Sequence, residues 1–155
     1  MAHHARCGGF VLAVVIARKL LLTAPLALLF VVWDAALAQD AQTSTVQSIA
    51  RAWLALTDRD DAAASYETAG TKFKSTMTRD RWIETLAQER APRGAVERRS
   101  VFKTDFVMSF PGAPEGNYAI VLFRTSFATR SDSSETVTLE REPDGNWRVV
   151  GYFIR

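Results

Sequence analysis

Apolar residues recur at helical spacing in three stretches of the chain. The first runs from Val46 to Thr57, the second covers 61–70, and the third begins at Thr78 and ends before Pro92. In each stretch the apolar positions lie three or four residues apart, which is the spacing of one helix face. The pattern therefore predicts three helices in this part of the chain.

Residues 39–45 precede the first of these stretches and are mostly polar. The sequence predicts that they form a flexible start to the domain. Because short hydroxyl side chains often accept hydrogen bonds from the first free backbone N–H groups of a helix, Thr43, Ser44 or Thr45 is expected to cap the first helix.

After Gly94 the period of the apolar positions changes from that of a helix to the alternation of strands. Pro, Gly, Asp and Ser residues divide this part of the chain at turns. The resulting fold class is α+β, with three N-terminal helices packed on a curved four-stranded antiparallel sheet. The strands are expected at 96–110, 118–128, 135–142 and 147–154, with turns at 111–116, 129–134 and 143–145.

Two of the expected strands are apolar on both faces, which raises the question of what covers the second face. Strict alternation in the last strand places Trp147 and Phe153 on one face and Tyr152 and Ile154 on the other. The helices cover one face. Two alternatives account for the other face. Either a partner subunit in a homodimer covers it, or a short strand from 66–75 pairs beside the last strand. In the first strand, alternation places these residues on one face: Phe102, Phe106, Met108 and Phe110.

Residues 1–38 have the parts of a secretory signal peptide. Arg18 and Lys19 precede the apolar run LLLTAPLALLFVVW, and Ala36-Leu37-Ala38 supplies small residues for cleavage. The run is shorter than the ~20 residues that span a bilayer. Cleavage leaves a domain of residues 46–155 behind its polar start, in the periplasm or secreted. The alternative is an uncleaved leader that anchors a homodimer to the inner membrane. Because a second apolar run precedes Arg18, a translation start further in, near Val14 or Val15, is an alternative.

The leader contains His3, His4 and Cys7, which are the only histidines and the only cysteine of the chain. A mature domain therefore has no imidazole and no thiol. This excludes a thiolate nucleophile, a Ser-His-Asp triad, a disulfide and the usual zinc sites.

The remaining charges indicate no cofactor, metal or nucleic acid. Lys and Arg balance Asp and Glu once the leader is removed, so no basic surplus favours nucleic acid. Asp58, Asp60 and Asp61 form an acidic run, but it lacks the residue pattern of a calcium-binding loop.

Three phrases resemble one bacterial family. They are WLALTDRDDAAASYETAG, RWIETLAQERAPRGAVERR and FPGAPEGNYAIVLFRTSFATRSDSSETVTLEREPDGNWRVVGYFIR. Together they resemble the family called domain of unknown function 4019, over residues 48–155. That family is similar in layout to the nuclear transport factor 2-like, or SnoaL-like, group, which implies a cystatin-like cone. The wider group contains isomerases, dehydratases, cyclases and many non-enzymes, so the resemblance implies no activity and no catalytic residue.

The sequence favours a non-catalytic module that binds a small ligand or takes part in assembly. Aromatic side chains on the helices and strands are candidates to line an apolar pocket, with Arg124 facing a bound anion. The same aromatic residues fit a filled core equally well, and Arg124 fits a cross-strand pair with Glu135 or Glu140. The candidate ligand-binding residues are Trp53, Tyr66, Trp82, Phe123, Arg124 and Trp147.

An enzyme of the isomerase or dehydratase type is the alternative. It needs a carboxylate base and a phenol that donates to the developing oxyanion. Asp105, in mid-strand between apolar neighbours, and Tyr152 are the candidates. Against them, ordinary alternation turns Asp105 toward solvent, opposite Phe106.

Overall fold

The computed structural model describes residues 24–155, with side chains from Ala38 onward. Residues 1–23, which include the start of the expected leader, lie outside the described part. Helix α1 (Ala24–Asp58) crosses from a unit that ends at Asp40 into a second unit, residues 41–155, which contains every other element. Among the described residues, no helix combines the length and hydropathy needed to cross a bilayer.

Four helices precede the sheet, one more than the sequence predicts: α1, α2 (Ala62–Thr68), α3 (Thr71–Thr76) and α4 (Arg79–Arg90). The additional helix α3 lies between the second and third helices that the sequence predicts. The predicted cap of α1 is wrong, because the helix begins well before it. The hydroxyls of Ser44 and Thr45 instead donate back to the carbonyl of Ala41 within the helix, at 2.9 and 2.8 Å.

The other helix starts follow the sequence signals. The Asp61 carboxylate accepts a hydrogen bond from Ala64 N at 3.0 Å and caps α2. The Thr78 hydroxyl accepts from Arg81 N at 3.3 Å and caps α4, as expected. In both cases the side chain satisfies a backbone N–H that has no partner inside the helix.

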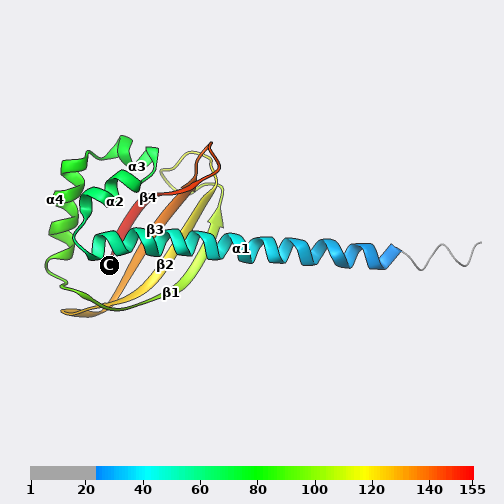
Figure 1. Ribbon diagram of the computed structural model, residues 1–155, viewed down its shortest axis with the longest axis horizontal. Helices are drawn as coiled ribbons and strands as arrows, with labels where there is room; N and C mark the ends of the chain where they lie inside the picture. The colour runs from blue at the N-terminus through cyan, green and yellow to red at the C-terminus, as the bar shows by residue number, and fades with distance from the viewer. Residues whose placement is uncertain (1–23) are drawn as a thin grey trace, which may run out of the picture. The chain divides into compact units, whose positions relative to one another are not determined.

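The four strands form one antiparallel sheet in the order β1-β2-β3-β4, which confirms the α+β class and the helices-before-sheet order (Figure 1). Their bounds are β1 (Val96–Val107), β2 (Tyr118–Phe127), β3 (Arg130–Arg141) and β4 (Trp147–Ile154). The expected turn at 129–134 is wrong, because β3 already begins at Arg130 and the connection after Phe127 is short. The residues at the start of β3 are polar, because one face of the strand is exposed to solvent, and for this reason the sequence suggested a turn.

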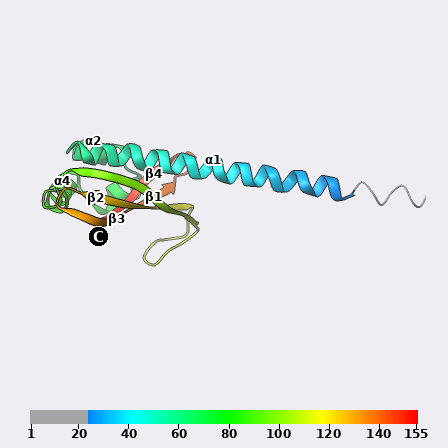
Figure 2. The same cartoon turned by 90° about the horizontal axis from the view of Figure 1, so that it is seen from below.

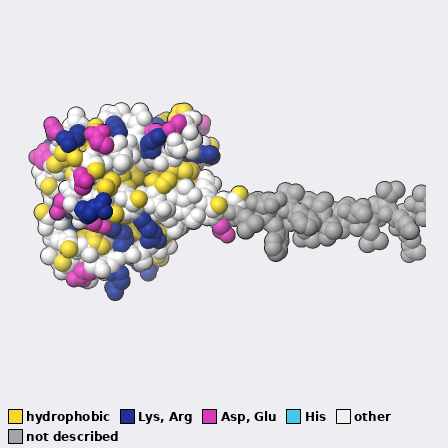
Figure 3. Space-filling view, in the orientation of Figure 1, with side chains coloured by type: hydrophobic (Ala, Val, Ile, Leu, Met, Phe, Trp, Pro, Cys, Tyr) yellow, Lys and Arg dark blue, Asp and Glu magenta, His cyan; other side chains and the backbone are white. Residues whose placement is uncertain are grey.

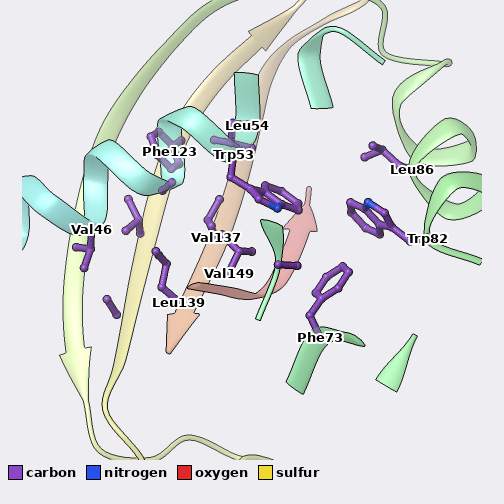
Figure 4. Close-up of a cluster of buried hydrophobic side chains, with 14 of the residues drawn as sticks. Val46, Trp53, Leu54, Phe73, Trp82, Leu86, Phe123, Val137, Leu139 and Val149 are labelled. Atoms are coloured by element: carbon purple, nitrogen blue, oxygen red, sulfur yellow. The ribbon is translucent and has the colours of Figure 1, made fainter. Parts of the chain in front are cut away.

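The helices of the 41–155 unit lie on one face of the sheet, as two perpendicular views show (Figures 1 and 2). The loop between β1 and β2 lies on the opposite side in Figure 2. We call the two sheet faces the helix face and the outer face. The core lies between the helices and the helix face, and α1 enters it with a stripe at helical spacing. The labelled core residues in Figure 4 are Val46, Trp53, Leu54, Phe73, Trp82, Leu86, Phe123, Val137, Leu139 and Val149.

A β-bulge in β4 explains why that strand is apolar at both odd and even positions. The register shifts between Thr138 and Leu139, so that Leu139 pairs with Val149 but Val137 pairs with Tyr152. The extra residue returns Tyr152 to the helix face that Val149 already occupies. The prediction of two separate apolar faces was therefore wrong, because it assumed unbroken alternation.

A second bulge lies in β1. The register shifts between Val101 and Lys103, so Phe102 is the unpaired residue. Phe102 is 53 % exposed, whereas Phe106 packs against the core. The prediction that the four residues from Phe102 to Phe110 share one face is thus wrong. Its last two members also lie outside β1, which ends at Val107.

No strand forms from residues 66–75, because this segment is helical in α2 and α3. A single backbone bond links it to the sheet: Gly70 N donates to Val149 O at 2.8 Å. A methyl group at Gly70 would lie 3.0 Å from the Val150 side chain, so the absence of a side chain permits this close approach.

Candidate functional site

A cluster of buried charged and polar side chains lies on the helix face of the sheet and connects α1 with the last strand, β4. We call it the buried charge cluster. It contains one residue from each strand and one from each of α1 and α4. The members are Asp58 (α1), Arg90 (α4), Arg99 (β1), Thr125 (β2), Glu135 (β3) and Tyr152 (β4).

Glu135 is at the centre of the buried charge cluster and has no exposed surface. Its Oε2 accepts hydrogen bonds from Arg99 Nε and from the Thr125 hydroxyl, both at 2.6 Å. Its Oε1 accepts from the Tyr152 hydroxyl at 2.5 Å and from Arg90 Nη1 at 3.1 Å. Such saturation is what a buried carboxylate requires, because an unpaired one would be strongly destabilising.

Asp58 lies at the partly exposed side of the cluster and bridges its two arginines. Arg99 donates from Nη1 and Nη2 at 2.6 and 2.9 Å, and Arg90 donates from Nη2. Burial disfavours the charged carboxylate, but the hydrogen bonds and charges of Arg99 and Arg90 outweigh burial and hold the pKa of Asp58 below its ordinary value. Two guanidinium groups thus face two carboxylates, and the cluster is neutral.

Tyr152 stays protonated in this environment. Burial and the neighbouring Glu135 carboxylate both raise the pKa of the Tyr152 phenol well above its ordinary value. One edge of its ring borders a groove of about 180 Å³ between α4 and β4, beside Trp82 and Phe153. Its hydroxyl, however, is already bonded to Glu135 and Arg90. A phenol held in this way is a structural donor within the cluster.

Asp105 and Tyr152 are not brought together. Asp105 pairs with Ile120 in the ladder and belongs to the outer face, where its carboxylate lies 3.0 Å from Lys103 Nζ. Tyr152 is on the helix face, beside Trp53. Because the sheet separates the two groups, one substrate cannot contact both.

Trp53 and Trp82, two of the expected pocket residues, fill the core together. Each is only 3 % exposed, and their ring centroids are 5.6 Å apart (Figure 4). Both indole N–H groups are satisfied by one buried residue: Trp53 Nε1 donates to Ser65 O at 2.8 Å, and Trp82 Nε1 donates to Ser65 Oγ at 2.9 Å. The two indoles therefore have their polar atoms committed to the fold.

The other expected pocket residues are dispersed. Tyr66 is half-buried and donates from its hydroxyl to Met77 O at 3.0 Å. Phe123 is fully buried in the core. Trp147 packs edge-on against Phe106, with ring centroids 6.0 Å apart. Arg124 lies on the outer face, where it pairs in the ladder with Ser134. The alternative pairing of Arg124 with Glu135 or Glu140 is not observed, because Glu135 points inward.

Arg124 instead lines a hollow of about 520 Å³ at one end of the outer face. We call this site the arginine hollow. Its charged lining consists of Arg98 (β1), Arg124 (β2), Arg130 and Asp132 (β3), and Arg155. Hydroxyl groups lie between the arginines, and its other lining residues include Ser100, Phe102, Leu122, Ser126 and Ser134.

The four guanidinium groups of the arginine hollow have no carboxylate within ion-pairing distance among the described residues. By contrast, Arg90, Arg99 and Arg148 each pair with two carboxylates. The face seen in Figure 3, the side of α1, shows both signs of charge interspersed. A local excess of cations around a concave surface favours anions.

The hollow and the buried charge cluster are the two sides of the same strand segments. Strand alternation sends Arg98 outward and Arg99 inward on β1, and Arg124 outward and Thr125 inward on β2. The cluster thus fixes the backbone on which the arginines stand. Sequence reasoning did not single out Arg99, and it considered Glu135 only as a partner of Arg124. The available signal was that Glu135 has the same phase as the buried Val137 and Leu139.

A family model described as "Protein of unknown function (DUF4019)" matches residues 49–152. The chain belongs to the DUF4019 family. No curated protein and no solved structure gave a match. The matched segment of this DUF4019 domain contains the whole buried charge cluster, and Arg98, Arg124 and Arg130 of the arginine hollow.

Within the described part of this DUF4019 domain, no group of His, Cys, Asp or Glu residues has the arrangement of a metal site. In the acidic run, Asp58 is paired with Arg90 and Arg99, and Asp61 caps α2. The third residue of the run, Asp60, has a left-handed backbone conformation with φ 58°. Asp tolerates this conformation better than most residues do.

Proposed function

We propose that this domain is a non-catalytic binding module whose ligand is an anion held in the arginine hollow. The observation that carries the proposal is the set of four guanidinium groups without carboxylate partners. Arg is the residue type that binds carboxylate and phosphate oxygens through two parallel N–H bonds. The volume of about 520 Å³ is in the range of small-molecule sites.

The electrostatics of the hollow support the same function. Four arginine side chains line the hollow, against one acidic side chain, that of Asp132. Their mutual repulsion is reduced by solvent but not removed, so a bound anion would stabilise the folded domain. Ser100 and Ser134 add hydroxyl donors between the cations. The cluster beneath holds β1, β2 and β3 in place, so that binding requires no rearrangement of the strands.

Catalysis has weaker support. The phenol of Tyr152 is used within the buried charge cluster, and Asp105 is on the other face of the sheet. The lining of the arginine hollow has cations and hydroxyls but only one acidic side chain, that of Asp132. This composition can bind and orient an anion, and it contains no poised acid–base pair.

A homodimer through the outer face is the competing role. The exposed side chains of Phe102 and Phe153, 53 % and 56 % exposed, favour it. Against it, such packing would bury cations of the arginine hollow without carboxylate partners, which is costly. The NTF2-like, cystatin-like relationship belongs to this proposal as well, and is compatible with either role.

The proposal also includes export and removal of residues 1–38. The supporting feature is the sequence of the leader, with its basic pair, apolar run and Ala-Leu-Ala ending. Among the residues whose side chains the structure describes, Val46 is the first core residue of α1, so cleavage after Ala38 removes none of the described core. Mass spectrometry of the protein from the periplasmic fraction should find Gln39 as the first residue. A chain that keeps its leader would contradict cleavage and favour the anchored form.

Citrate titration by calorimetry tests the binding function. We expect citrate to bind, and the double variant Arg98→Gln/Arg124→Gln to bind roughly tenfold more weakly for each arginine removed, at about 1.4 kcal/mol each. The matched control is Arg79→Gln/Arg81→Gln, which removes the same charge from exposed positions on α4. Equal weakening in both double variants would show a non-specific charge effect and refute the site.

A further inference from the structure

The outer face carries two parallel rows of side chains, one cationic and one apolar. In the cationic row, Ser100 pairs with Arg124 and Arg124 with Ser134. Arg155 continues this row, because its backbone N–H and C=O are both bonded to Ser134, at 2.9 and 3.2 Å. The row thus crosses β1, β2 and β3, ends at Arg155 directly after β4, and alternates hydroxyl and guanidinium groups.

The apolar row lies two residues away from the cationic row on each strand. Leu122 pairs with Thr136, and Thr136 pairs with Phe153. Phe102 extends this row at the other edge, because alternation from the inward Val101 turns it outward, and both Phe102 and Leu122 line the arginine hollow. The bulge adds a second residue here, since Lys103 is the one that pairs with Leu122.

The two rows are joined by a pair of arginine–phenylalanine contacts. The guanidinium carbon of Arg124 is 4.0 Å from the centroid of the Phe102 ring, and that of Arg155 is 5.6 Å from the Phe153 ring. Such contacts hold a planar cation against an aromatic face. Both rings are nevertheless about half exposed. Large exposed apolar side chains beside a charged site are typical of a surface that binds something partly apolar.

We propose that the ligand of the arginine hollow is an amphipathic anion: a phosphate, sulfate or carboxylate headgroup in the cationic row, with an apolar tail along Phe102 and Leu122. This inference rests on the proposed function and specifies its ligand. Residues two apart on one strand face are about 6–7 Å apart, so a tail of about six carbons reaches from one row to the other. The occupant is a single amphiphile molecule.

A series of phosphates with increasingly long alkyl chains tests this inference on the whole protein. The probes are inorganic phosphate and ethyl, butyl and hexyl phosphate, each titrated by calorimetry below the concentration at which hexyl phosphate aggregates. We expect affinity to rise about two- to fourfold per methylene, because burial of each CH₂ against the apolar row is favourable. In Phe102→Ser this increase per methylene should fall to less than half.

Two controls separate the possible causes. Met108→Ser removes another exposed apolar side chain, 64 % exposed, that lies outside both rows, and it should leave the series unchanged. Arg124→Gln should weaken all four probes by a similar factor. If Phe102→Ser fails to fold, the slope of the series in the unaltered protein is still decisive.

Several results would overturn the inference. Equal affinity for inorganic and hexyl phosphate would refute the apolar row while leaving the anion-binding function intact. Failure of every anion to bind would refute both proposals. Binding to phosphatidylglycerol vesicles without binding to hexyl phosphate would show a membrane-docking surface, and would refute a site for a single amphiphile. If affinity still rose by the full factor per methylene in Phe102→Ser, the tail would not lie along this row.

Discussion

The hydroxyl of Tyr152 donates a hydrogen bond to Glu135 Oε1 across β4 and β3, at 2.5 Å, in the interior of the domain. This contact exists because the bulge in β4 returns Tyr152 to the helix face, where Glu135 also points. Arg90 donates to both groups, so the last strand, its neighbour and α4 meet at one point. The stability of the fold should therefore respond sharply to changes at these positions.

Glu135→Gln tests the charge balance of the cluster. The amide keeps the shape of the side chain but leaves Arg90 and Arg99 with Asp58 as their only anionic partner. A buried charge left without its partner costs about 3–5 kcal/mol, so unfolding in urea should occur at much lower denaturant concentration. Glu84→Gln, at an exposed pair with Arg81, should change stability by less than about 0.5 kcal/mol. Similar losses in both variants would show that the cluster is not a centre of stability.

Asp58→Asn should reveal the acid dependence of the same cluster. The pKa of Asp58 is lower in the folded protein than the value of about 3.9 in an unfolded chain. A lowered folded-state pKa gives stability that is complete above about pH 4 and is lost as the pH falls toward the folded-state pKa. The difference in unfolding free energy between the unaltered protein and Asp58→Asn should therefore be constant from pH 5 to 8 and shrink below pH 4. A difference that does not change over that acid range would contradict the assignment.

Tyr152→Phe should act at the opposite end of the pH scale. The pKa of Tyr152 is raised by burial and by Glu135, so its contribution is complete below the unfolded value of about 10 and declines as the pH rises beyond it. At pH 7 the variant should lose about 1–3 kcal/mol, and the loss should diminish above pH 10. Tyr66→Phe is the control, since it removes a hydroxyl bonded to the neutral carbonyl of Met77. Urea unfolding at several pH values measures both variants.

Ser65→Ala should destabilise the aromatic core through one indole. The substitution removes the hydroxyl that accepts from Trp82 Nε1, and it retains the backbone carbonyl that accepts from Trp53. The buried N–H of Trp82 would lose its partner, at about 1–3 kcal/mol. Ser75→Ala, which removes an exposed hydroxyl bonded to Lys72 O, should have little effect. Tryptophan fluorescence during unfolding gives both values, and equal midpoints would exclude a structural role for the Ser65 hydroxyl.

The sequence by itself determined the fold class, the order of helices before strands and the approximate extent of β1, β2 and β4. These features depend on local signals: apolar spacing, the Thr78 cap of α4, and the Pro- and Gly-rich turn before β2. It also singled out Arg124 as a residue able to face an anion. The predictions of the fold succeed because they require only neighbouring residues in the chain, whereas the role of Arg124 stays a prediction.

Only the tertiary structure decided which face each strand residue occupies. The bulges in β1 and β4 each add one residue, and one added residue moves every later side chain of the strand to the opposite face. No residue type in the sequence marks the position of a bulge. For this reason Phe102 and Phe106 separate, and Tyr152 reaches Glu135. The buried charge cluster and the arginine hollow also combine residues from distant strands, joined by cross-strand register that a single chain pattern does not encode.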